Sequence, residues 1–171
     1  MPAAPQKATF FARIARGGLS LPANQKRRSS LPRILAIDYG TKRTGLAVSD
    51  PLQLIANGLD TVPTAELIGF LERYLQEEEV ACIVVGEPLY PDGNPAQIHH
   101  LVVGLVRQLK KLFPGVEVVT HDERFSSEQA KLAIRQSGAR QKKRRDKSLV
   151  DKISAVIILQ DFMESKRKDS D

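Results

Sequence analysis

Three acidic residues lie at the ends of apolar or amphipathic segments, where a carboxylate can be held in a fixed position. Asp38 directly follows the apolar run 34–37, Glu123 ends the segment "VEVVTHDE", and Asp151 lies early in "SLVDKISAV". Two unit charges about 4 Å apart repel one another by roughly 4 kcal/mol at an effective dielectric constant of about 20. A cluster of three carboxylates is therefore stable only when protons or cations neutralise it.

Carboxylate-rich, all-oxygen sites suit Mg²⁺ or Mn²⁺. Two such ions about 3.5–4 Å apart can hold the attacking and leaving oxygens of a phosphodiester. Asp38, Glu123 and Asp151 are therefore predicted as both the metal ligands and the catalytic residues of a phosphodiester hydrolase. Each acid also has a structural interpretation: a turn residue, part of a solvated charge run and part of a helix-start box beginning at Ser148, respectively. The prediction of a site depends on the three acids together.

The elements that must position these acids follow from the apolar periodicity. Strands are expected at 34–38, 44–50, 52–62 (interrupted by Asn57-Gly58), 80–86 and 116–123, and helices from 64, over 95–113, over 126–138 and over 148–164. The first three strands are close enough in sequence for an antiparallel meander, whereas the last two are joined by helical crossovers. This order predicts an α/β fold with a mixed five-stranded sheet and helices on both faces.

This sheet would bring the acids together. Asp38 and Glu123 end strands that we expect to run parallel, and sites in open α/β sheets form outside the carboxyl ends of such strands. Asp151 would complete the cluster if the last helix packs beside the first strand.

Charge is distributed unevenly along the chain. Residues 1–33 contain seven basic residues and no acid, which leaves 19 basic and 20 acidic residues in 34–171, a net charge of −1. We therefore expect a basic, disordered N-terminal extension over 1–33, one domain over 34–165 and a charged tail over 166–171. The extension could contact nucleic acid, act as a leader or reflect the choice of start codon.

The single cysteine, Cys82, lies in the apolar run "VACIVVG" and cannot form an internal disulfide. It is predicted to be a small buried apolar residue. A chain without disulfides fits a reducing compartment, so the predicted location is cytoplasmic. No apolar stretch approaches the roughly 20 residues that a membrane-spanning helix needs.

Four motifs together resemble the YqgF/RuvX family: "AIDYGTKRTGLAVSD", "VVGEPLYPDGN", "DERFSS" and "DKISAVIILQDF", in this order. The resemblance covers about 34–164 and implies an RNase H-like fold, and it places the family's acidic positions on Asp38, Glu123 and Asp151. Members are described as pre-16S rRNA nucleases or as Holliday junction resolvases. Two positions depart from the family pattern: Ser154 replaces the first of two alanines, and Glu87 stands where many members have an uncharged residue.

The resemblance, together with basic and hydroxyl-bearing segments near the acids, points to nucleic-acid contacts. The candidates are Thr41, Lys42, Arg43 and Thr44 in the first turn, Arg124 beside Glu123, and Lys142, Lys143, Arg144, Arg145 and Lys147 before the last helix. Neutralising phosphates with these cations would make the affinity fall with salt. The structural alternative is a solvated hairpin tip and a basic surface loop.

The predicted function is that of a metal-dependent nuclease. The preferred substrate is the 16S rRNA precursor, whose 5′ end the enzyme would mature. Cleavage of branched DNA as a Holliday junction resolvase is the first alternative, and a non-catalytic nucleic-acid-binding factor is the second. Junction resolvases act as symmetric dimers, so a monomer would favour RNA. An ATP-binding fold of the actin and sugar-kinase group also has an Asp-x-Gly-Thr hairpin, but one domain cannot form its two-domain clamp.

Overall fold

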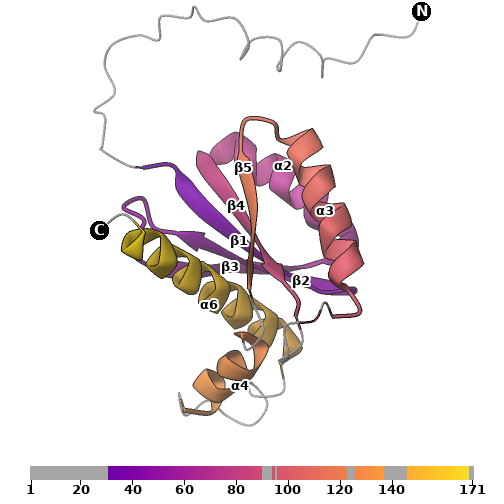
Figure 1. Cartoon of the computed structure of the whole chain (residues 1–171), viewed down its shortest axis with the longest axis vertical. Helices are drawn as coiled ribbons and strands as arrows, with labels where there is room; N and C mark the ends of the chain where they lie inside the picture. The colour runs from indigo at the N-terminus through magenta and orange to yellow at the C-terminus, as the bar shows by residue number, and fades with distance from the viewer. Residues whose placement is uncertain (1–30, 90–93, 95, 123–125, 137–145, 170–171) are drawn as a thin grey trace, which may run out of the picture.

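The computed structural model describes residues 31–89, 94, 96–122, 126–136 and 146–169. These residues form a single sheet with helices on both faces (Figure 1). The elements in chain order are β1 (Arg33–Tyr39), β2 (Arg43–Ser49), β3 (Ala56–Pro63), the 3₁₀ turn η1 (Thr64–Glu66), α2 (Leu67–Glu77), β4 (Val80–Glu87), α3 (His99–Leu112), β5 (Glu117–Asp122), α4 (Ser126–Gln136) and α6 (Lys147–Lys168).

The sheet has the strand order β3-β2-β1-β4-β5. β1 pairs antiparallel with β2 and parallel with β4, while β2 pairs antiparallel with β3 and β4 pairs parallel with β5. This is the predicted RNase H-like arrangement of three antiparallel strands followed by two parallel ones, and the predicted fold class is confirmed. β1 lies at the centre of the sheet because it receives hydrogen bonds from neighbours on both sides.

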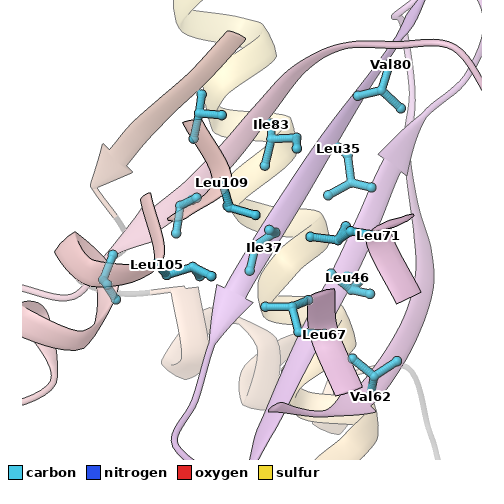
Figure 2. Packing of buried hydrophobic residues seen from close by; sticks show 13 residues of the cluster. Leu35, Ile37, Leu46, Val62, Leu67, Leu71, Val80, Ile83, Leu105 and Leu109 are labelled. Carbon is cyan, nitrogen blue, oxygen red and sulfur yellow. The ribbon is translucent and has the colours of Figure 1, made fainter. Parts of the chain in front are cut away.

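Two hydrophobic clusters lie on opposite faces of the sheet. Leu35 and Ile37 of β1 point to the first face, where α2 and α3 cover them with side chains such as Leu71 and Leu109 (Figure 2). Alternate residues of β1 point to the second face, which is covered by α6. This alternation follows from the period of two in a strand, and it decides which side chains of β1 can meet α6.

Several boundaries differ from the sequence-based ones. The predicted strand 52–62 begins only at Ala56, because the carboxylate of Asp50 accepts the backbone N–H groups of Leu52, Leu54 and Ile55 and folds 50–55 into a turn. The pairing of β2 with β3 shifts by one residue between Leu46 and Ala47, so the interruption predicted near Asn57-Gly58 is a bulge.

The helices also differ in length from the predictions. α3 begins at His99 rather than at 95. α6 continues beyond 164 to Lys168, so residues 166–168 belong to this helix rather than to the expected tail.

Cys82 is buried in β4, as predicted for a small apolar residue. Burial raises the pKa of its thiol to about 12, so the thiol stays protonated and unreactive at neutral pH. Within the part of the chain that the structure describes, no helix is long and apolar enough to cross a membrane.

Candidate metal and nucleic-acid site

Asp38 lies near the carboxyl end of the central strand β1, on the face that α6 covers. Ile34 and Ala36 belong to the cluster under α6, and Asp38 is the next residue in the same alternation. The strand is apolar up to this position because both of its faces are buried, and the acid appears where the cover of the sheet ends. Asp38 is accordingly only partly buried, as a residue that meets a hydrophilic ligand should be.

The positions beside Asp38 in the sheet carry no side chains. Gly45 of β2 is its direct partner, and the register of β4, in which Val85 pairs with Ile37, brings Gly86 level with Asp38 on the other side. Residues opposite one another in neighbouring strands point to the same face, with Cα atoms about 4.5–5.5 Å apart in an antiparallel pair. The carboxylate of Asp38 therefore stands between two glycines.

Gly45 is also the point where α6 touches the sheet. A Cβ atom on Gly45 would overlap the carbonyl group of Asp151 and lie 3.0 Å from the backbone nitrogen of Lys152. Only glycine lets the backbone of the helix approach the strand this closely. Because Gly45 is paired with Asp38, the backbone of Asp151 lies against the residue that neighbours Asp38 in the sheet.

Two further contacts hold the first turns of α6 in place. The hydroxyl of Thr61 in β3 donates a hydrogen bond to the carbonyl oxygen of Ser148 at 2.7 Å. A Cβ atom on Gly58 would lie within 3 Å of the aliphatic stem of Lys152, so this side chain packs flat on β3. The start of α6 is therefore seated on both β2 and β3.

Asp146 caps α6. One of its oxygens accepts the backbone N–H of Ser148 at 3.0 Å, the hydroxyl of Ser148 at 2.7 Å and the backbone N–H of Leu149 at 3.4 Å. The alternative interpretation made Asp151 part of a capping box that begins at Ser148. It does not apply, because the N-cap of α6 is Asp146, two residues before Ser148. The carboxylate of Asp151 is left to other partners.

Replacing Asp146 with alanine should destabilise the start of α6 in a pH-dependent way. The hydroxyl and backbone of Ser148 lower the pKa of Asp146. A lowered pKa adds stability that is present above the unfolded pKa of about 4 and is lost as pH falls through the folded pKa. The difference in urea midpoint between wild type and Asp146→Ala should therefore be largest at neutral pH and shrink in acid.

Ser148→Ala is the control for this prediction. It removes one of the three donors and should give a smaller difference of the same sign. A difference that stays constant from neutral pH to acid would show that the charge of Asp146 does not stabilise α6.

Asp151 forms an ion pair with Arg43. The Nε of Arg43 donates to Oδ2 of Asp151 at 3.0 Å, across 108 residues of sequence, and both side chains are partly exposed, by 41% and 26% respectively. Arg43 is the first residue of β2 and shares the face of Gly45, two residues further on. The guanidinium therefore already neutralises one of the predicted metal ligands.

The predicted nucleic-acid contacts in the turn between β1 and β2 differ in their exposure. Thr41 and Lys42 are exposed beside Arg43. Thr44 is fully buried, and its hydroxyl lies 3.0 Å from the hydroxyl of Thr64, which in turn donates to the carbonyl of Gly40 at 2.6 Å. Thr44 thus supports the turn from inside and does not present its hydroxyl to a ligand in this structure.

Lys147, the first residue of α6, is exposed one turn before Asp151. The remaining predicted site residues lie outside the described part of the chain: Glu123, Arg124, Lys142, Lys143, Arg144 and Arg145. Among the residues that are described, no group of three His, Cys, Asp or Glu side chains could hold a metal ion. The backbones of Asp38 and Asp151 are thus linked through Gly45, and the three-acid site remains a prediction.

Two side chains near this edge of the sheet have other partners. Glu87 follows Val85 in the alternation of β4, so it lies on the face of α2 and α3, opposite to that of Asp38. Its carboxylate is 2.9 Å from Nε2 of His99. His121 shares the face of Asp38, but its ring packs edge-on against Phe162 at 5.7 Å between centroids. Both residues are therefore explained by local packing.

Sequence reasoning missed the role of Gly45. A signal for it was present, because a glycine inside a strand pattern often marks a close approach of another backbone. Asp38 and Gly45 flank the first turn almost symmetrically, so their pairing could have been read from the hairpin. The helix that approaches Gly45 could not have been identified this way.

Comparisons with known proteins identify relatives of the chain. The model of the RuvX family, described as Holliday junction resolvase, matches residues 32–165. A protein of Flavobacterium johnsoniae named "Putative pre-16S rRNA nuclease" is 46% identical over 137 residues, which are 80% of this chain and 99% of that protein. A protein of Bacteroides thetaiotaomicron with the same name is 50% identical over 137 residues, with the same coverage.

Among solved structures, the chain is similar to Thermus thermophilus RuvC in complex with a Holliday junction substrate. The TM-score is 0.45 and the identity 18%, over 80% of this chain and 96% of that chain.

Proposed function

Because the chain belongs to the RuvX family, we propose that it is a nuclease that hydrolyses phosphodiester bonds with the help of divalent cations. We further propose that it acts in maturation of the 5′ end of the 16S rRNA precursor, in the cytoplasm. In support, the relatives that are 46% and 50% identical to it bear the name "Putative pre-16S rRNA nuclease". The similarity covers 99% of the length of each of these relatives.

One observation carries the proposal. In its support, Gly45 pairs with Asp38 in the sheet and touches the backbone of Asp151, so one residue contacts the backbones of two acids that are 113 positions apart in sequence. The approach requires a glycine in β2 and a helix start that is held in place, here by the Asp146 cap. If Asp38 or Asp151 had only a local structural role, the backbone of the other acid would have no need to lie at Gly45.

The donor chemistry of the site fits Mg²⁺ or Mn²⁺. Asp38 and Asp151 would supply carboxylate oxygens, the donor type that these hard cations prefer. Glu123 is proposed as the third ligand on the basis of the sequence, in which it directly follows Asp122, the last residue of β5. When bound, a pair of such cations stabilises the charge that develops on the oxygens around phosphorus.

The chain's own residues would bind and orient the substrate. Asp38 is held by the central strand and Asp151 by the capped start of α6, so neither carboxylate depends on a long loop for its position. Thr41, Lys42 and Lys147 lie exposed around them and would contact backbone phosphates. Arg124 and the basic residues at 142–145 are proposed to extend this surface on the basis of sequence alone.

DNA junction cleavage is the second candidate, because the family model carries that description. The two activities place different demands on the protein: cutting two strands of a four-way junction symmetrically calls for a dimer, whereas trimming one RNA end does not. A non-catalytic nucleic-acid-binding factor would need neither metal nor intact acids.

A cleavage assay separates these candidates. Labelled RNA spanning the 5′ end of a 16S precursor and a labelled four-way DNA junction would each be incubated with the full chain, with and without Mg²⁺. The proposal expects Mg²⁺-dependent cleavage of the RNA by a protein that sedimentation shows to be a monomer. Preferential, paired cleavage of the junction by a dimer would favour the second candidate. Binding without cleavage of either would reject a nuclease.

A further inference from the structure

The ion pair between Arg43 and Asp151 poses a problem for the proposed site. Nε of Arg43 lies 3.0 Å from Oδ2 of Asp151, in hydrogen-bonding geometry. A carboxylate oxygen that accepts this bond shares its charge with the guanidinium and is a weaker ligand for a second cation. A divalent ion and the guanidinium therefore compete for the same negative group.

The ion pair between Arg43 and Asp151 can break without a change in the backbone. Arg43 is 41% exposed and Asp151 26% exposed, and ion pairs at such partly hydrated positions are weak enough to exchange. The backbone of each residue is fixed independently of the pair, Arg43 in β2 and Asp151 in α6. Breaking the contact therefore requires only side-chain rotation and leaves the fold unchanged.

A released Arg43 would be able to bind a phosphate of the substrate. It begins β2 directly after the exposed residues Thr41 and Lys42, at the same edge of the sheet as Lys147. A guanidinium presents several donors in a planar fork that matches the oxygens of a phosphate. The side chain that neutralises Asp151 in one state is thus suited to hold nucleic-acid backbone in another.

We propose that Arg43 is a positioning residue that couples cation binding to substrate binding. Without a divalent cation, its guanidinium neutralises Asp151. When the cation takes over that carboxylate, Arg43 is released and contacts a phosphate of the nucleic acid. This inference rests on the proposed function, since it assumes that Asp151 is a metal ligand.

The first test observes the ion pair directly. The Nε–Hε signal of Arg43, assigned in a proton–nitrogen NMR spectrum by its loss in Arg43→Lys, should shift when Mg²⁺ is added. Arg33 is a matched internal control, because its Nε donates to Oε2 of Glu78 at 2.7 Å at the other end of β1. The Arg33 signal should stay in place. An Arg43 signal that is equally unmoved at saturating Mg²⁺ would overturn the inference.

The second test measures the coupling by binding. Affinity for a fluorescein-labelled RNA hairpin is compared for wild type and Arg43→Gln, in EDTA and in Ca²⁺, a cation chosen to support binding. The substitution should weaken binding about threefold to tenfold in Ca²⁺, the effect of one lost phosphate contact, and less than about twofold in EDTA. Lys42→Gln removes a neighbouring exposed cation and should weaken RNA binding by the same factor in EDTA and in Ca²⁺. An equal loss for Arg43→Gln in both conditions would refute the coupling.

Two outcomes separate this inference from the proposed function. If wild type and Asp38→Asn bind Mn²⁺ equally weakly in calorimetry, the metal site itself is absent and both ideas fail. If wild type binds Mn²⁺ and Asp38→Asn does not, while Arg43 behaves identically with and without the ion, only the inference fails. Circular dichroism of Arg43→Gln and Arg43→Lys checks that both variants fold.

Discussion

Asp38→Asn is expected to abolish Mg²⁺-dependent cleavage, lowering the rate by a factor on the order of 10³. The amide keeps the size of the carboxylate but removes the charge that holds a cation. Because Asp38 lies in the central strand between Gly45 and Gly86, no neighbouring side chain in the sheet can replace it. The measurement is single-turnover cleavage of labelled RNA, with the enzyme in excess.

Asp169→Asn is the matched control for this result. Asp169 follows the last residue of α6, about 33 Å along the helix from Lys147, and the same chemical change there should leave cleavage unaltered. Equal Mn²⁺ affinity in Asp38→Asn and wild type, with cleavage retained, would show that the acids of this face do not form the catalytic site.

Gly45→Ala should destabilise the fold strongly for a change that adds a single methyl group. Its Cβ would meet backbone atoms of Asp151 and Lys152, which cannot rotate away as a flexible side chain would. Overpacking of this kind costs about 1–3 kcal/mol and sometimes more. The start of α6 must also move away from β2, so cleavage should fall together with the free energy of unfolding. Urea denaturation and the cleavage assay measure the two effects.

Gly104→Ala provides the opposite expectation from the same substitution. Gly104 lies in α3, where no atom comes within 4 Å of an added Cβ, and alanine in an open helical position is favoured by about 0.5–1 kcal/mol. The two variants should therefore shift the urea midpoint in opposite directions. An unchanged midpoint for Gly45→Ala would mean that α6 is not seated on β2 as described.

The arrangement of the sheet was predictable because each strand carried a local signal for its surroundings. The apolar run 34–37 without polar alternation indicated a strand covered on both faces, and such a strand belongs at the centre of an α/β sheet. The abrupt change from apolar residues to Asp38 indicated a functional site at the carboxyl end of this strand. The strand boundary at 52 was wrong because Asp50 satisfies the backbone of the next residues, an interaction that competes locally with strand pairing.

The contacts that assemble the site were beyond prediction from patterns. Neither the ion pair of Arg43 with Asp151 nor the seat of α6 on Gly45 follows from periodicity, because both join segments more than 100 residues apart. Thr44 shows the same limit on a smaller scale. It stands among exposed, ligand-like neighbours in sequence, but the alternation of β2 turns its side chain inward to Thr64. The role of Glu123 stays a prediction.

The position of each strand in the sheet also bears on how such a site can diversify. β1, which carries Asp38, is hydrogen-bonded along both edges, whereas β5 has a partner only in β4. A central strand tolerates few changes, but an edge strand can be lengthened, bent or re-aimed at little cost to the remainder of the sheet. Evolution can thus alter the edge strand β5 to suit a different polymer while Asp38 keeps its place in the central strand.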